Sequence, residues 1–259
     1  MYFYIYDTFV NQKKYEREIG AIETRLTDLG ISGKIGRLNA FSNARGLIRD
    51  ELRHGAQTIV VVGNDDTIAK VIEGIEDTKL TLGIIPLGDS LSIASALGIP
   101  FGVDACDVLA KRITQKIDLG KVNGRYFLTQ LQILRGKLTM EADGCCKIST
   151  LSADCELIVR NLRRTDSLVA QSQSGNPKDG FLDALIMPKT GMFENLFSRG
   201  KKQKISTAAS VIPLRTMIVT SEEPVAILAD GREFRHNNLS IEVVPEKLKV
   251  ITGRERVFA

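Results

Sequence analysis

The chain has little of what usually marks a metal centre or a secreted protein. Its 259 residues contain no tryptophan, two histidines and four cysteines. The cysteines show none of the paired spacings of a zinc site, so we expect reduced structural thiols. They are Cys106, Cys145, Cys146 and Cys155. These absences argue against a zinc site and against a fold held together by disulfides.

Long apolar runs are also absent from the sequence. No stretch approaches the ~20 apolar residues that a membrane-spanning helix needs. The N-terminal residues 1–7 lack the basic region and the long apolar region of a signal peptide, and they predict a first strand instead. We therefore expect a cytoplasmic protein.

No large excess of charge of one sign is present. The net charge of +4 is too small and too dispersed to predict a nucleic-acid partner. One basic cluster contains Lys201, Lys202 and Lys204. It is interpreted either as a solvated loop or as a peripheral contact with an anionic membrane at its inner face, where each basic residue contributes on the order of 1 kcal/mol.

The first half of the chain alternates strand and helix patterns. Alternation of this kind predicts right-handed crossovers and a parallel sheet, here a Rossmann-like α/β lobe over residues 1–120. The strand patterns are Phe3–Tyr6, Gly33–Leu38, Thr58–Val62 and Thr81–Ile85. The helical patterns are Tyr15–Leu29, Asn43–Arg53, Thr67–Gly74 and Ser92–Leu97.

The second half changes to short alternating apolar runs, which predict an antiparallel β-sandwich lobe over residues 121–259. Its exposed strand edges would suit a homodimer. A helical turn is expected at Gly191–Phe197. The expected strands are Arg125–Leu134, Lys147–Leu151, Cys155–Val159, Ala184–Met187, Thr216–Thr220, Val225–Leu228, Leu239–Val244 and Leu248–Ile251. The cleft between the lobes is the expected site.

Two turns of the first half predict an anion site. Apolar residues Thr58–Val62 lead into the Gly63 turn, and either Asp65 or Asp66 is expected to cap the helix that follows. Unpaired backbone N–H groups and the helix dipole attract anions at such a turn. The strand that ends at Gly88 repeats this arrangement. Because the sequence has no Gly-x-x-x-x-Gly-Lys-Ser/Thr motif, a P-loop enzyme is excluded.

These turns resemble those of the diacylglycerol kinase catalytic-domain family, which includes bacterial lipid kinases and sphingosine kinases and shares a superfamily with NAD kinases. That family carries Gly-Gly-Asp-Gly-Thr where this chain has Gly-Asn-Asp-Asp-Thr at residues 63–67. It carries Pro-Leu-Gly-Thr-x-Asn-Asp-Phe-Ala-x-Ala-Leu-Gly-Ile-Pro where this chain has Pro-Leu-Gly-Asp-Ser-Leu-Ser-Ile-Ala-Ser-Ala-Leu-Gly-Ile-Pro at residues 86–100. Similar segments at Asp179–Asp183 and Ala229–Gly231 extend the resemblance over nearly the whole chain. The family's N-terminal Asn-Pro loop is missing, and Tyr4–Thr8 stands in its place.

The resemblance implies ATP- and magnesium-dependent phosphorylation of a lipid hydroxyl, such as that of diacylglycerol. It implies that Asp65 lies near metal and phosphate, with Asp66 as a second candidate metal ligand, and that Asp230 acts as the general base. The implied nucleotide-binding residues are Gly63, Asn64, Asp65, Asp66, Thr67, Gly88, Asp89 and Ser90. The structural alternatives are that Asp65 only caps a helix and that Asp230 only forms a tight turn with Gly231.

Several departures from the family motifs favour a second hypothesis, a catalytically degenerate member that works as a binding or regulatory protein. Asp66 replaces a glycine and puts a carboxylate beside the expected polyphosphate. Two like charges 4 Å apart cost about 4 kcal/mol at an effective dielectric constant of 20, roughly a thousandfold in affinity. Other departures are Asn64, Asp89, Leu91, Ser92, Lys178 and Arg232. A changed phosphoryl donor or a more cationic ligand would also suit the added carboxylates.

Overall fold

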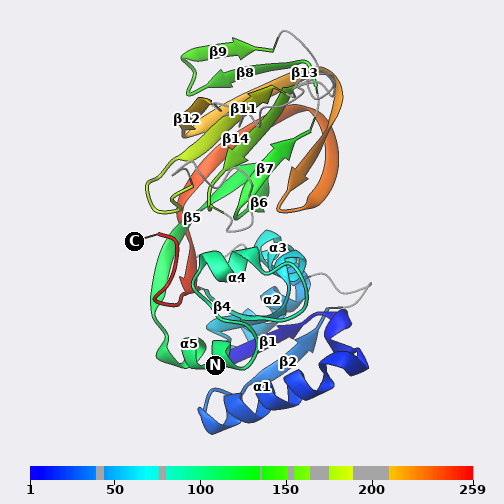
Figure 1. The fold of residues 1–259 in the computed structure, drawn as a ribbon, viewed down its shortest axis with the longest axis vertical. Coiled ribbons are helices and arrows are strands. Elements are labelled where there is room, and N and C mark those ends of the chain that lie inside the picture. Colours follow the sequence, from blue (N-terminus) through cyan, green and yellow to red (C-terminus); the bar gives the residue numbers. More distant parts are fainter. Residues whose placement is uncertain are drawn as a thin grey trace, which may run out of the picture.

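The computed structural model describes residues 1–38, 44–75, 80–134, 136–150, 155–163, 175–188 and 210–258. They form an α/β lobe and a β lobe that follow one another along the long axis of the molecule (Figure 1). The basic cluster Lys201, Lys202 and Lys204 and the expected turn Gly191–Phe197 lie outside the described residues. Peripheral membrane contact and a homodimer therefore stay predictions.

The α/β lobe is built on parallel strands whose order is β2-β1-β3-β4. β3 and β4 are buried along their whole length, as expected for strands covered on both faces by helices. These strands are β1 (Tyr2–Tyr6), β2 (Lys34–Arg37), β3 (Thr58–Gly63) and β4 (Thr81–Pro86). All four strands were predicted. Three of them are buried apolar runs bounded by turns, which are strong local signals, while β2 is mostly exposed.

Helices cover the parallel sheet. α1 (Glu16–Asp28) contacts α5 (Asp104–Lys111), and α2 (Ala44–Arg53) contacts α3 (Asp65–Gly74). α4 (Ser92–Ala96) follows β4. Two 3-10 helices, Thr8–Asn11 and Lys13–Tyr15, connect β1 to α1. The sequence pattern missed α5, whose Leu109 packs closely over Gly83 of β4.

The β lobe is antiparallel and has its own hydrophobic cluster, which includes Leu131, Leu157 and Ile227. The described strands that make up most of it are β6 (Arg125–Phe127), β7 (Gln130–Ile133), β8 (Leu138–Ala142), β9 (Cys146–Ser149), β10 (Cys155–Arg160), β11 (Leu182–Pro188), β12 (Ser210–Leu214) and β13 (Thr216–Ala229). The pattern missed β8 and β12, joined β6 and β7 into one strand, and divided β13 into two.

Two long strands run between the lobes (Figure 1). β14 (Arg232–Ile251) pairs with β13 in the β lobe, and its last residues pair in parallel with β4. β5 (Thr114–Val122) pairs with β14 on both sides of a bulge between Val244 and Leu248. The expected strands Leu239–Val244 and Leu248–Ile251 are therefore parts of one strand.

The predicted fold class, an α/β lobe with a parallel sheet followed by an antiparallel β lobe, is confirmed. The division at residue 120 stays a prediction. Leu248, Val250 and Phe258, from the end of the chain, pack in the same hydrophobic cluster as the α/β lobe. Among the described residues, no helix is long and apolar enough to cross a membrane.

Candidate functional site

The first turn is capped by Asn64. Its Oδ1 accepts hydrogen bonds from the backbone N–H of Thr67 at 3.2 Å and from the Thr67 hydroxyl at 3.0 Å. The expectation that Asp65 or Asp66 caps this helix is wrong, because Asn64 has the extended backbone of an N-cap and both aspartates are already in the first turn of α3. An asparagine here therefore stabilises the turn where the family has glycine.

Asp65 joins the first turn to the second. Its carboxylate accepts hydrogen bonds from the backbone N–H of Ser92 at 2.9 Å and of Ile93 at 3.1 Å, and from the hydroxyls of Ser92 at 2.6 Å and Ser90 at 3.3 Å. Its own N–H donates to the Ser90 carbonyl at 2.9 Å. Asp65 is 5% exposed, so it stabilises the start of α4 from inside the protein.

Thr67 is tied to the end of the first strand. Its buried hydroxyl lies 2.9 Å from the carboxylate of Asp7, which also pairs with Lys70 at 3.4 Å. Burial opposes the charge on Asp7, but the Thr67 hydrogen bond and the Lys70 ammonium outweigh it and hold the pKa of this carboxyl below its usual value. The sequence did not single out Asp7, although its place directly after a buried strand was a usable signal.

The second turn is covered by two aromatic side chains from the residues between β1 and α1. A Cβ atom placed on Gly88 would lie 2.8 Å from the Phe9 ring and 3.6 Å from the Tyr15 hydroxyl. The two rings pack edge to face, with their centroids 5.6 Å apart. Asp89 and Ser90 are exposed, and Ser90 has a left-handed φ of 61°. Aromatic side chains therefore occupy space over Gly88 where a phosphate was expected.

Asp230 is held by the backbone that follows β6. Its two oxygens accept hydrogen bonds from the N–H groups of Leu128 at 2.6 Å, Thr129 at 2.8 Å and Gln130 at 3.2 Å, and from the Thr129 hydroxyl. Burial raises the pKa of Asp230, and these hydrogen bonds oppose the rise. With φ values of 46° and 83°, Asp230 and Gly231 also form the tight turn that the structural alternative proposed.

The cleft between the lobes brings α3 against the hairpin that contains Asp230. The Asp66 Oδ1 atom lies 3.7 Å from where a Cβ atom on Gly231 would be, and Asp66 itself is exposed. Glu73 forms an ion pair with Arg232 and lies 3.8 Å from Arg125. The cavity at this contact measures about 20 Å³, room for a water molecule but far below the ~300 Å³ of a small-molecule site. The lobes therefore touch here without a ligand-sized gap.

The ion pair across the cleft should contribute little to stability. The Glu73 and Arg232 side chains are 28% and 44% exposed, and exposed pairs contribute about 0.2–1 kcal/mol. We expect a double-mutant cycle of Glu73→Ala and Arg232→Ala, measured by urea denaturation, to give a coupling energy in this range. The same cycle with Lys147→Ala in place of Arg232→Ala is the control. A coupling above about 2 kcal/mol would mean that this pair locks the lobes together.

The described residues supply no preformed cluster of carboxylates for a magnesium ion. Among them, no three acidic, histidine or cysteine side chains lie close enough to hold a metal ion. Both carboxylate oxygens of Asp65 accept hydrogen bonds from N–H and hydroxyl groups. The Asp65 carboxylate is therefore already occupied and does not face a metal ion together with Asp66, which is exposed. Three nucleotide-site candidates, Gly63, Asn64 and Thr67, do lie together at the carboxyl end of β3, with Gly88 and Ser90 at the end of β4.

The fold consists of an α/β lobe followed by an antiparallel β lobe. Solved structures of two kinds of kinase align with it. A diacylglycerol kinase from Bacillus anthracis aligns with a TM-score of 0.77 and 19% identity, covering 98% of this chain and 97% of that one. An NAD kinase from Archaeoglobus fulgidus, solved in complex with ATP, aligns with a TM-score of 0.60 and 14% identity, covering 99% and 96%. At these identities the likeness establishes the fold alone.

Sequence comparison finds similarity to the same family. Residues 2–122 match the family model for the diacylglycerol kinase catalytic domain. A diacylglycerol kinase from Bacillus subtilis is 27% identical over 128 residues, covering 48% of this chain and 42% of that protein. A probable lipid kinase from Xanthomonas axonopodis is 22% identical over 255 residues, covering 80% and 82%. The chain is thus similar over residues 2–122 to the diacylglycerol kinase catalytic domain, and the resemblance seen in its motifs is confirmed.

The extent of these matches differs between relatives. The Bacillus subtilis alignment spans less than half of that protein, and a Pseudomonas aeruginosa relative, 36% identical over 88 residues, is spanned over 29% of its length. The family relationship is therefore stronger than any statement about a shared activity.

Proposed function

We propose that this chain is a diacylglycerol kinase-like protein that has lost ATP-dependent phosphoryl transfer and works as a binding or regulatory protein. One observation supports this most directly. The two carboxylates that the family relationship offers for catalysis, Asp65 and Asp230, are both buried and accept hydrogen bonds from nearby N–H and hydroxyl groups. A general base needs a free acceptor within reach of the substrate proton.

The covered second turn supports the same proposal. Phosphate groups bind at turns where glycine lets the backbone approach closely and leaves N–H groups free. Here the Phe9 ring lies where a ligand would approach Gly88, and exposed Asp66 and Asp89 add negative charge around the turns. Sterics and electrostatics thus both disfavour a polyphosphate.

The active lipid kinase, with ATP and magnesium as cofactors, is the second candidate. The observation that favours it is the approach of Asp66 to the hairpin of Asp230 and Gly231 across the cleft. Phosphoryl transfer depends mostly on positioning donor and acceptor between such elements. In that case Phe9 and Tyr15 would have to move away from Gly88 when nucleotide binds.

A thermal-shift titration with ATP, with and without magnesium, separates the two candidates. A ligand at 100 times its dissociation constant adds about 2.7 kcal/mol, which raises the midpoint by roughly 5–10 °C for a domain of this size. We expect no saturable shift up to millimolar ATP, and no transfer of labelled phosphate to diacylglycerol in mixed micelles. The Bacillus subtilis diacylglycerol kinase is the positive control. A saturable shift that needs both ATP and magnesium would overturn the proposal.

Removing the charge of Asp66 should improve ATP binding only slightly. Asp66 is exposed, so the dielectric constant that applies is near that of water, and the repulsion at 4 Å falls to about 1 kcal/mol. We expect Asp66→Gly, like the wild-type protein, to show no saturable shift up to millimolar ATP in the same titration, because a gain of no more than about tenfold is too small to restore binding. Asp66→Asn is the matched control, since it removes the charge and keeps the side chain. A thousandfold gain would show that this carboxylate alone blocks the site.

A further inference from the structure

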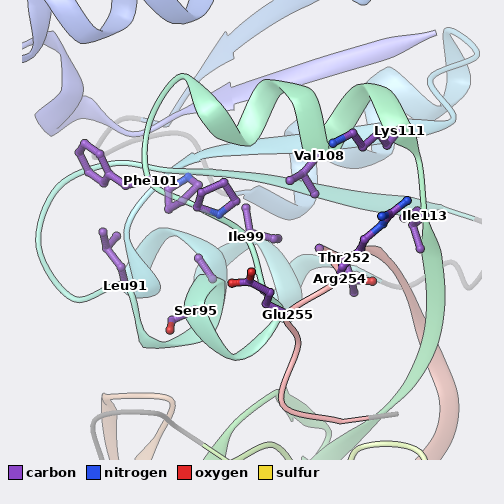
Figure 2. A pocket seen from close by; sticks show the side chains of 15 residues that line it. Leu91, Ser95, Ile99, Phe101, Val108, Lys111, Ile113, Thr252, Arg254 and Glu255 are labelled. Carbon is purple, nitrogen blue, oxygen red and sulfur yellow. The ribbon is translucent and has the colours of Figure 1, made fainter.

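A second cavity lies away from the two turns, between α4, α5 and the segment that follows β14 (Figure 2). It measures about 630 Å³, within the range of about 300–1,000 Å³ that is typical of sites for small molecules. Neither Asp65 nor Asp230 lines it. Pro86 and Leu91, which flank the second turn, do line it, so the cavity lies behind that turn.

Close backbone packing fixes one wall of this cavity. The N–H of Thr252 donates to the carbonyl of Ile113 at 2.8 Å, and that of Gly253 donates to the carbonyl of Leu97 at 2.9 Å. A Cβ atom on Gly253 would lie 1.7 Å from the carbonyl oxygen of Gly98, so only glycine fits there. The hydrogen bonds to the residues after α4 and α5 place Arg254 close to the end of α5.

The cavity is polarised along its length. Figure 2 shows Phe101 and Leu91 at one end and Lys111, Thr252 and Arg254 at the other, with Ile99 and Val108 between them. Lys111 and Arg254 are exposed, and the single acidic residue in the lining is Glu255. One end therefore offers apolar surface and the other a net positive charge.

Two further observations indicate a ligand that has both an apolar part and a polar, anionic part. Phe101 and Val103 are 51% and 38% exposed, so apolar surface continues outward from the apolar end. At the cationic end, the buried hydroxyl of Thr252 has no hydrogen-bond partner among the residues that the structure describes. Unpaired buried polar groups are rare in folded proteins, and one in the lining of a cavity suggests a partner that the protein does not supply.

We propose that this cavity binds an anionic amphiphile. Its acyl chain lies toward Leu91 and Phe101, and its phosphate or carboxylate headgroup lies between Lys111 and Arg254. Apolar lining takes up the chain, and the two cations select the charged headgroup. The proposal does not depend on phosphoryl transfer, because the cavity contains none of the candidate catalytic residues.

The absence of tryptophan from the chain allows a direct test. Phe101→Trp puts a single tryptophan at the apolar end of the cavity, and Phe181→Trp in the β lobe is the matched control. Oleate and 1-oleoyl lysophosphatidate are titrated below their micelle-forming concentrations and distinguish a carboxylate from a phosphate headgroup. We expect saturable blue-shifted emission from Trp at position 101 with at least one of them, and quenching there, but not at position 181, by dibrominated stearate.

Charge and volume variants in the Phe101→Trp background locate the site. Lys111→Glu with Arg254→Glu should weaken binding about tenfold or more, while Lys137→Glu with Lys147→Glu, the same charge change in the β lobe, should not. Ser95→Phe should place a ring in the lining of the cavity and weaken binding. Three outcomes would overturn the proposal. They are equal binding of uncharged monooleoylglycerol, an equal loss of binding in both double variants, and no saturable signal with either anionic probe. Circular dichroism of each variant excludes loss of the fold as the cause.

Discussion

Asp65→Ala is expected to destabilise the protein by about 3 kcal/mol. The substitution leaves the N–H groups of Ser92 and Ile93 without their acceptor in a buried place, and each unsatisfied buried donor costs roughly 1–3 kcal/mol. It also removes a negative charge from the start of α4. Urea denaturation followed by circular dichroism measures the change. Because proteins of this kind are stable by only about 5–15 kcal/mol, the loss is large.

Asp66→Ala is the matched control for this experiment. Asp66 is the next residue along the chain and is exposed, so its loss should cost less than about 1 kcal/mol. A different result would change the role of Asp65. If both variants were equally stable and only Asp65→Ala lost activity on a lipid substrate, Asp65 would be catalytic and not structural.

Asp230→Ala is expected to cost about 3–4 kcal/mol. Its carboxylate accepts hydrogen bonds from three successive N–H groups, those of residues 128–130, inside the protein. Alanine also fits poorly at a φ of 46°, where asparagine and aspartate are better tolerated. Asp230→Asn should therefore cost less than Asp230→Ala, since it keeps one acceptor and the turn. Urea denaturation of both variants tests this order.

The chain supplies a matched control for Asp230 in a second Asp-Gly turn. Asp143 has a φ of 48°, precedes Gly144 and accepts hydrogen bonds from the N–H groups of Arg215 and Thr216 on the surface. We expect Asp143→Ala to cost about 1 kcal/mol, because water replaces the lost acceptor. Equal costs at both turns would mean that burial contributes nothing at Asp230.

The parallel half of the fold could be predicted because its signals are local. Buried strands such as β3 and β4 appear as continuous apolar runs, and each is followed by a turn and a helix. α5 was missed since it has eight residues and buries only Ala105, Cys106 and Leu109 on its inner side. β14 was divided in two because Pro245, Glu246 and Lys247 interrupt its apolar pattern, and the structure has a bulge there at which Glu246 takes a φ of 49°.

The sequence predicts where the candidate site lies, but it does not predict which side chains contact one another there. The sequence placed both turns at one edge of the sheet, and they do meet there through Asp65 and Ser90. Which side chain caps which helix could not be deduced, because Asp65 reaches Ser92 across 27 positions of the chain. Similarly, the covering of Gly88 by Phe9 depends on how the residues after β1 fold back over the second turn.

The path of β14 has a consequence for how the protein is made. The α/β lobe lacks its last strand until Lys249 and Val250 pair with Thr81 and Leu82 of β4. Contacts so distant in the chain form slowly, since a long loop must close first. During synthesis, this edge of β4 therefore stays unpaired at least until residues 249 and 250 have left the ribosome.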